Sequence, residues 1–148
     1  MAATNPKKQL KHFITSLQDQ GILDVFFNQL QQLNSKQNPP LLLELISIFC
    51  QDAEISIAEM THHLNSAVVD YDKVIAWVHK LKGGSASIGG KQVAAACREL
   101  RLACDDKHQE RCVAALQKTK EAFSILRDNL NAISDLERAI LETEGRRS

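Results

Sequence analysis

The sequence contains little of what strands, tight turns and membrane spans require. Of its 148 residues only 6 are glycine and 3 are proline, and Phe, Trp and Tyr together make up 5%. Leu, Ala, Gln, Glu and Lys are plentiful instead, a composition that favours helices over strands and turns. Purely apolar runs, such as Leu41 to Leu43, are far shorter than the roughly 20 residues that cross a bilayer. We therefore expect an all-α chain that does not span a membrane.

The sequence also has no net charge. Lys and Arg total 18, and Asp and Glu total 18, which argues against broad charge-driven binding to nucleic acid or to an anionic membrane. The start, MAATNPKKQL, lacks the apolar segment of a secretory signal, so we expect the protein to stay inside the cell. We interpret the basic trio Lys7, Lys8 and Lys11 as a solvated helix face.

No CxxC pair occurs among the four cysteines, and the interior of a cell would keep them reduced. We interpret Cys50, Cys97, Cys104 and Cys112 mainly as small buried residues. Cys104, His108 and Cys112 have the spacing of metal ligands on one helical face, but a predicted turn interrupts them and no clear fourth ligand is evident. His62 and His63 point about 100° apart on a helix, which favours a solvated helix end. We predict no metal site.

Apolar residues recur every three or four positions in six segments separated by breakers. The turn signal from Asn34 to Pro40 places Pro40 at the first position of a helix. Asp105 to His108 form a short connection, and we expect the end from Thr143 to be frayed. The predicted helices cover Lys7–Gln18, Asp24–Leu33, Leu42–Asn65, a stretch from an Asp70 cap to Gly89, a stretch through Val93 and Cys104, and a last, longest helix from Cys112 through Ile140.

Four of these helices are amphipathic and joined by short connections. They bury their apolar stripes most simply as an antiparallel four-helix bundle, with the two short N-terminal helices covering one end. We expect one domain over residues 1–148. Such a bundle has no intrinsic chemistry, so function must lie in residues that break its pattern.

The fourth predicted helix contains such residues. Its stripe is Val74, Val78, Leu81, Ser85 and Ile88, yet the same stretch holds a histidine, two lysines and two adjacent glycines. A glycine inside a helix costs roughly 1 kcal/mol relative to alanine, so Gly83 and Gly84 need a reason beyond helix formation. The residue at position 83 would normally cover the turn that carries His79, so Gly83 leaves that patch bare. Lys82 lies three residues from His79 on the same side.

This pattern suits phosphoryl exchange on His79. A neutral imidazole is a nucleophile, and the Lys82 ammonium would meet a phosphoryl group on the ring with a positive charge. No GxxxxGK[ST] loop is present for a nucleotide, and a helix surface offers no carboxylate cage for Mg²⁺. The phosphoryl donor and the metal would therefore come from a partner, and the chain itself would need no cofactor.

The segment HKLKGGSASIGG, read as H-x-x-K-G-x-S-x-x-x-G from His79 to Gly89, resembles the phosphorylation motif of histidine-containing phosphotransfer proteins, most closely those of plants. The resemblance extends over nearly the full length. It includes QGILDVFFNQLQQL, IFCQDAE, the spacing of Cys97 and Cys104 around Arg101, and the pair Leu136-Glu137.

The resemblance implies a monomeric shuttle in a multistep two-component relay, and not an enzyme. His79 would accept phosphate from the receiver domain of a hybrid sensor kinase, with Mg²⁺ held by that domain, and pass it to a response regulator. In plants this implies cytokinin-type signalling and movement between cytoplasm and nucleus. Lys82 would correspond to the phosphate-neutralising lysine of the family, Gly83 to its close-approach glycine, and Ser85 to a small polar position.

Two residues depart from the usual plant pattern, because Lys80 stands where glutamine is common and Gly84 where serine is common. Pseudo-members of the family lack the histidine, which is present here. The alternative function is a phosphate-incompetent helical adaptor that binds receiver domains and competes with active shuttles.

Other residues have two readings each. Ser85 lies on the apolar stripe and suits packing as well as phosphate contact, and Arg101 is either near His79 on the next helix or an ordinary surface arginine. Trp77 either packs or helps to bind a partner. Leu23, Phe26 and Phe27 are candidates for an apolar cover or docking patch beside the bundle, with core burial as the default for aromatic residues.

Overall fold

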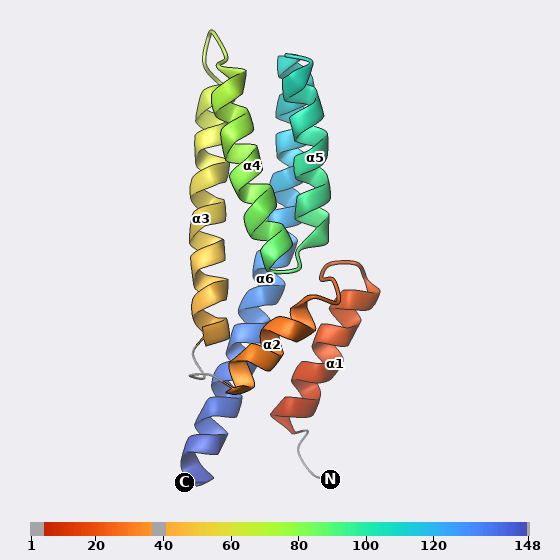
Figure 1. Cartoon of the computed structure of the whole chain (residues 1–148), viewed down its shortest axis with the longest axis vertical. Helices are drawn as coiled ribbons and strands as arrows, with labels where there is room; N and C mark the ends of the chain where they lie inside the picture. The colour runs from red at the N-terminus through yellow and green to blue at the C-terminus, as the bar shows by residue number, and fades with distance from the viewer. Residues whose placement is uncertain (1–4, 37–40, 148) are drawn as a thin grey trace.

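A computed structural model of the chain describes residues 5–36 and 41–147, and every regular element within them is a helix (Figure 1). None of these helices is long and apolar enough to pass through a membrane. The helices are α1 (Pro6–Asp19), α2 (Phe27–Lys36), α3 (Leu41–Leu64), α4 (Tyr71–Ser87), α5 (Lys91–Asp105) and α6 (Gln109–Arg147).

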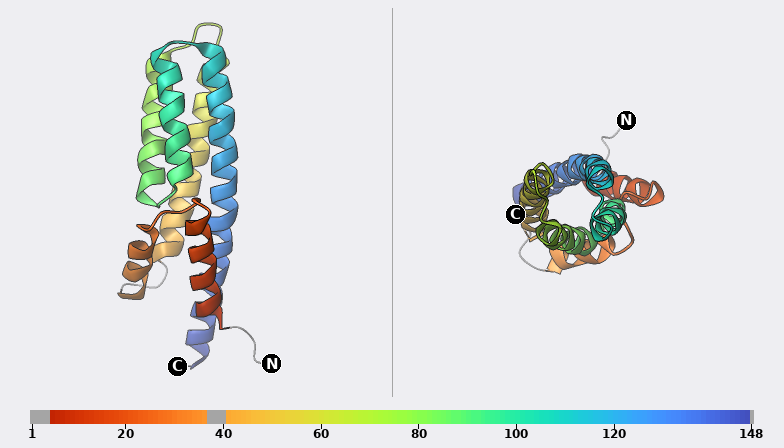
Figure 2. Two further views of the ribbon diagram at one scale, coloured as in Figure 1. Left: turned by 90° about the vertical axis from the view of Figure 1, so that its right-hand side faces the viewer. Right: turned by 90° about the horizontal axis from the view of Figure 1, so that it is seen from above.

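The last four helices form the predicted antiparallel bundle. Helix α3 packs on α4, α4 on α5, α5 on α6 and α6 on α3, and the end-on view in Figure 2 shows the resulting ring. Helix α6 extends beyond the other three at one end, where α1 packs along it and α2 packs against α3 (Figure 1). The prediction that the two short N-terminal helices cover one end of an all-α bundle is confirmed.

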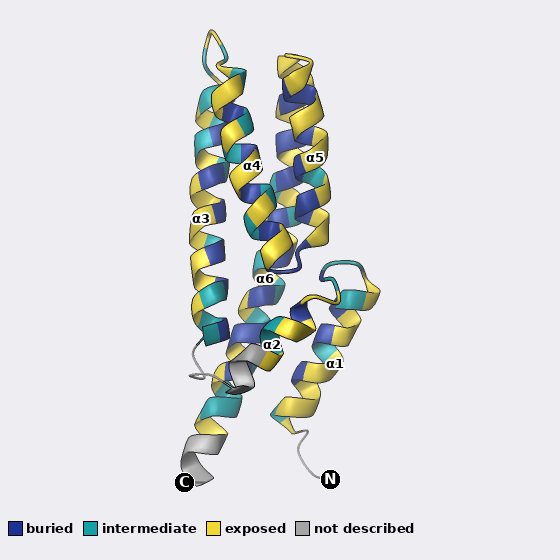
Figure 3. Ribbon diagram, in the orientation of Figure 1, coloured by how far each residue is buried: buried dark blue, intermediate teal, exposed yellow. Residues whose placement is uncertain are grey.

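The predicted apolar stripes face the bundle interior (Figure 3). All five residues of the predicted stripe from Val74 to Ile88 are buried, and at the same spacing on α5 so are Val93, Cys97, Leu100 and Cys104. On α3 the spacing of three and four residues predicts Ile57 in the core, but Ile57 is half-buried and the neighbouring Ser56 is buried. The small hydroxyl is accommodated because Ser56 Oγ donates to the Asp52 carbonyl at 2.9 Å within the same helix, which leaves no buried donor unsatisfied.

Helix ends differ from the prediction at three places. Helix α2 begins at Phe27 because residues 24–26 form a turn, in which the Asp24 Oδ1 atom accepts from the backbone N–H of Phe26 at 2.9 Å. Helix α2 then continues through Lys36, where a turn from Asn34 was predicted, and α6 continues through Arg147, where a frayed end was predicted. Pro40 lies outside the described residues.

The connection between α1 and α2 is clamped to the hairpin between α4 and α5. The Asp24 backbone N–H donates to the Gly89 carbonyl at 2.8 Å. Gly89 has φ +81°, and a Cβ there would lie 2.7 Å from Asp24 Oδ1. A Cβ on Gly90 would lie 2.5 Å from Leu126 Cδ2 on α6. The positive φ of Gly89 favours glycine there, and a side chain at position 90 would require Leu126 to shift. This contact fixes the C-terminal end of α4.

The buried cysteines give a test of the core. Cys97, Cys104 and Cys112 are buried and Cys50 is half-buried, and burial raises the pKa of Cys97 and of Cys104 to about 12. Since the thiolate is the reactive form, we expect an aromatic disulfide reagent at pH 8 to label Cys50 first and the other three only after denaturation. A Cys50→Ala variant is the control. Equal labelling of all four thiols in the native protein would contradict this packing.

Candidate functional site

The candidate site lies on α4, and its orientation is set by the core. Asp70 caps the helix, and its side chain accepts from the Lys73 backbone N–H at 3.3 Å. Val78 and Leu81 are each 2% exposed and face the interior. Successive residues turn by about 100° around a helix, so burial of Val78 directs His79 outward. The apolar stripe therefore determines which side chains α4 presents to solvent.

His79 is exposed, as predicted. Within the described residues its side chain forms no hydrogen bond and no ion pair. An imidazole that no neighbour holds keeps both ring nitrogens accessible to another molecule. This is the state that a surface nucleophile requires.

Lys82 lies one turn from His79, on the side of α4 that faces α5. Its positive charge is close enough to the Cys97 thiol to act against the burial that raises the pKa of Cys97. Lys82 is half-buried and forms no ion pair among the described residues. Its ammonium is therefore available to an anion bound at His79, since no carboxylate already neutralises it.

Gly83 is exposed, and a Cβ built there would meet no atom of the chain within 4 Å. Nothing inside the protein therefore requires a glycine at this position, although glycine weakens the helix. The space that the missing side chain leaves lies beside His79, because helical side chains lean toward the N-terminus. The opening suits the close approach of a second molecule.

Two other predicted site residues do not join this group. Ser85 is fully buried, and its Oγ donates to the Leu81 carbonyl at 2.7 Å, which favours the packing reading over a phosphate contact. Arg101 is exposed on α5, where its Nε donates to Asp105 Oδ1 at 3.0 Å. Among the described residues no hydrogen bond or ion pair joins Arg101 to α4.

Two of the three candidates for an apolar cover or docking patch follow the default expectation of core burial. Leu23 and Phe27 are 0% exposed and belong to the core, because the turn before α2 directs both inward. Only Phe26 is exposed, next to Val25. Trp77 is half-buried beside the core, and the Lys80 Nζ atom lies 5.4 Å from the centre of its ring.

The residues weighed as metal ligands have other roles. His108 Nδ1 accepts from the Arg111 backbone N–H at 3.1 Å, while the Cys104 and Cys112 sulfurs lie 3.6 Å apart inside the bundle. His62 and His63 lie in the last turn of α3. Over residues 5–36 and 41–147 no group of three or more His, Cys, Asp or Glu side chains is placed to hold a metal ion.

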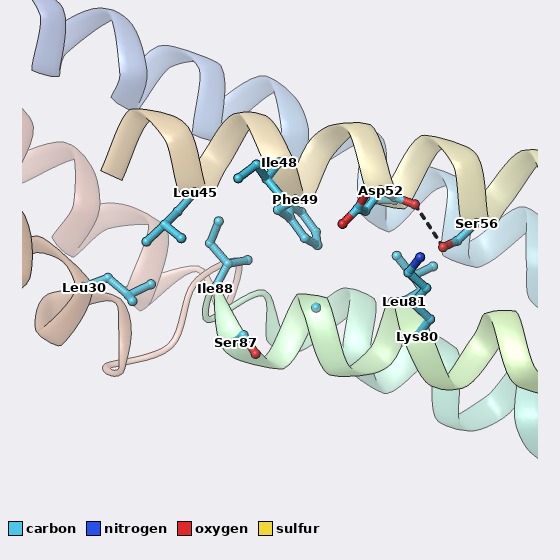
Figure 4. A pocket seen from close by; sticks show the side chains of 12 residues that line it. Leu30, Leu45, Ile48, Phe49, Asp52, Ser56, Lys80, Leu81, Ser87 and Ile88 are labelled. Carbon is cyan, nitrogen blue, oxygen red and sulfur yellow. Dashed lines mark hydrogen bonds between the residues drawn. The ribbon is translucent and has the colours of Figure 1, made fainter. Parts of the chain in front are cut away.

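One feature near the site was not predicted, an apolar pocket of about 390 Å³ between α3 and α4. Figure 4 shows α3 side chains facing α4 side chains across it, with α2 at one end. The apolar lining includes Leu30, Leu45, Ile48, Phe49, Leu81 and Ile88. The sequence did hold a signal: Leu45 and Ile48 are apolar residues off the core stripe of α3, and Ile48 is 55% exposed.

Comparison with known proteins agrees with this geometry. The Hpt domain model matches residues 44–136. The chain is 38% identical to histidine-containing phosphotransfer protein 2 of Oryza sativa subsp. japonica over 95% of both chains, and 34% identical to histidine-containing phosphotransfer protein 1 of Arabidopsis thaliana over 98% and 94%. The crystal structure of a histidine-containing phosphotransfer protein from maize superposes with a TM-score of 0.86 and 36% identity, over 92% of this chain and 99% of that one. The chain therefore belongs to the Hpt family, together with the histidine-containing phosphotransfer proteins of plants.

Proposed function

We propose that the chain carries a phosphoryl group on His79 from one receiver domain to another. Members of the Hpt family are phosphorelay carriers and not catalytic enzymes. The observation that supports the proposal for this chain is the exposed His79 imidazole, which has no partner among the described residues and lies beside Lys82 and the open position at Gly83 on a helical bundle. The sequence has no GxxxxGK[ST] loop of the kind that holds a nucleotide.

The chemistry needs only a nucleophile and a place for negative charge. A ring nitrogen of His79 attacks the phosphorus of an aspartyl phosphate on the partner, an N–P bond forms, and the P–O bond breaks as the partner aspartate leaves as a carboxylate. The reverse reaction delivers the group to a second aspartate. Lys82 offsets the charge of the phosphoryl oxygens, and Mg²⁺ belongs to the partner, since carboxylates hold it best.

The proposed partners are receiver domains of hybrid sensor kinases as donors and of response regulators as acceptors. The similarity to plant phosphotransfer proteins over nearly the whole chain supports this pairing. It also supports a role in cytokinin-type signalling, with a monomer that moves between cytoplasm and nucleus. The balanced net charge is consistent with binding to proteins in preference to nucleic acid.

The experiment that tests the function is transfer from a phosphorylated receiver domain to the purified chain. A carrier becomes labelled with a phosphate that is labile in acid and stable in base, as a P–N bond is, and then loses the label to a second receiver domain. Binding without any label would identify the chain as the adaptor considered above and reject the carrier function.

Lys82→Ala is expected to slow transfer roughly 10- to 100-fold, the range that corresponds to losing one charge-assisted contact to the phosphoryl group. The fold should be unaffected because Lys82 forms no ion pair among the described residues. Lys73→Ala is the matched control, an exposed lysine at the start of the same helix. Rapid-quench measurement of the transfer rate distinguishes the two, and equal rates for both variants would remove Lys82 from the mechanism.

A further inference from the structure

The pocket between α3 and α4 contains both residues that depart from the usual plant pattern. Lys80 and Gly84 line it from α4, whereas Gly83 and Lys82 lie on the other flank of the helix. A Cβ on Gly84 would lie 3.6 Å from Phe49 Cδ1, an ordinary contact distance. A Cβ at position 84 is therefore tolerated, and because Gly84 lines the pocket, the rest of a larger side chain would take up space in the pocket.

The polar groups of the pocket are mostly occupied. The Ser56 hydroxyl donates to the Asp52 carbonyl and the Ser87 hydroxyl to the Gly83 carbonyl, each at 2.9 Å. The interior between them is apolar, so an apolar occupant fits it better than a polar one. Ile48, on its rim, leaves 55% of its surface in water.

Two charged side chains face the opening from opposite walls, Asp52 on α3 and Lys80 on α4 (Figure 4). Among the described residues neither forms an ion pair. Lys80 instead lies over the indole ring of Trp77, a contact that a partner carboxylate can replace. Among the described residues that line the pocket Lys80 is the basic one and Asp52 the acidic one, so an acidic group of an entering molecule is attracted to the α4 wall and not to the α3 wall.

The pocket and the proposed phosphorylation site lie on the same turns of α4, on neighbouring flanks of the helix. Residues 80, 81, 84, 87 and 88 line it, and they alternate along α4 with residues 79, 82 and 83. A protein that places an aspartate against His79 covers about two turns of α4, and so it lies over the pocket as well. The charge and the shape therefore belong to one docking surface.

We propose that this pocket receives an apolar side chain of the docking receiver domain, such as Leu, Met or Phe, with an acidic residue beside it facing Lys80. The inference rests on the proposed function. Gly84 supplies the space and Lys80 the charge, so these two residues select among receiver domains. They are positioning residues that take no part in the bonds that form and break at His79.

Gly84→Leu tests the proposal by filling the pocket from inside. The variant should fold, since leucine favours a helix more than glycine does. Phosphoramidate, a small donor that transfers its phosphoryl group to the imidazole and releases ammonia, should label it at the wild-type rate. Transfer from receiver domains of rice and Arabidopsis hybrid kinases that label the wild type should fall by roughly tenfold or more, as when an interface loses a central anchor. Ala95→Leu, on the exposed face of α5, is the matched control.

A second pair of variants separates charge from space. Lys80→Gln should slow transfer mainly at low salt, because salt screens an exposed ion pair. Gly84→Ser should transfer at a rate between that of the wild type and that of Gly84→Leu. Each variant should change the order in which receiver domains rank by transfer rate more than it changes the mean transfer rate. Steady-state binding, measured by titration of each variant with the same receiver domains, should follow the transfer rates.

The outcomes are distinguishable. If phosphoramidate labels the wild type and Gly84→Leu accepts phosphate from every receiver domain as fast as Ala95→Leu, the pocket proposal is overturned and the carrier function stands. A wild type that neither donor labels overturns both. If phosphoramidate labels it but no receiver domain does, the partner class is wrong and the pocket proposal falls. A dimer of the free chain that Gly84→Leu dissociates would assign the pocket to a second copy, again against the proposal.

Discussion

His79→Gln is expected to abolish phosphoryl transfer to this chain. Glutamine has an amide where histidine has a nucleophilic ring nitrogen, so no N–P bond can form, and no other exposed histidine has both a lysine three residues later and a glycine four residues later. The side chain is exposed and unpaired, so its replacement should leave folding unchanged. The measurement is acid-labile label after incubation with a phosphorylated receiver domain, together with the thermal unfolding midpoint.

His62→Gln is the matched control, since His62 is also an exposed helical histidine. It should accept phosphate at the wild-type rate. The variant at position 79 should still bind the receiver domain, because the docking surface remains in place. If His79→Gln is labelled as strongly as the wild type, or if labelling is lost in His62→Gln, the acceptor is another residue and the proposed site is rejected.

Much of the fold and the centre of the site could be predicted from periodicity alone. The spacing of three and four residues identified every buried position of the α4 stripe and placed His79 outside it. Gly83 and Gly84 stood out because glycine is costly inside a helix. Those inferences depend only on the spacing of residues within one helix, which can be seen in the amino-acid sequence.

What could not be predicted depends on contacts between elements distant in sequence. The turn that carries Asp24 is stabilised by the Gly89 carbonyl, and this contact buries Leu23 and Phe27, which had been candidates for docking. The pocket depends on how α3 packs against α4 near Gly84 and Phe49. The roles of Ser85 and Arg101 depend on hydrogen bonds that the spacing of residues does not determine.

The two adjacent glycines of α4 therefore have different surroundings. Gly84 faces a pocket inside this chain, whereas Gly83 faces solvent with no atom of the chain within reach of a Cβ. A side chain at position 83 would change nothing within the protein except the helix itself. This makes Gly83 a position where an effect on transfer can be separated from an effect on folding.

Gly83→Ala should raise the free energy of unfolding by about 1 kcal/mol, because alanine replaces glycine in a helix without any clash. Gly83→Leu should also be folded, yet we expect its transfer rate to fall on the order of 100-fold, the scale of a 1 Å misplacement of reacting groups. The alanine variant should lie between glycine and leucine. Stability is measured by denaturant titration and transfer by rapid quench.

Ala114→Leu, an exposed position on α6, controls for added surface bulk and should transfer at the wild-type rate. A close-approach glycine predicts that the variant is more stable and transfers more slowly. The wild-type glycine lowers the stability of the helix but leaves His79 accessible to the partner. If Gly83→Leu transfers as fast as Ala114→Leu, the partner does not pass over this turn. His79 would then be approached from the α3 flank alone, and the pocket beside Lys80 would be the dominant contact.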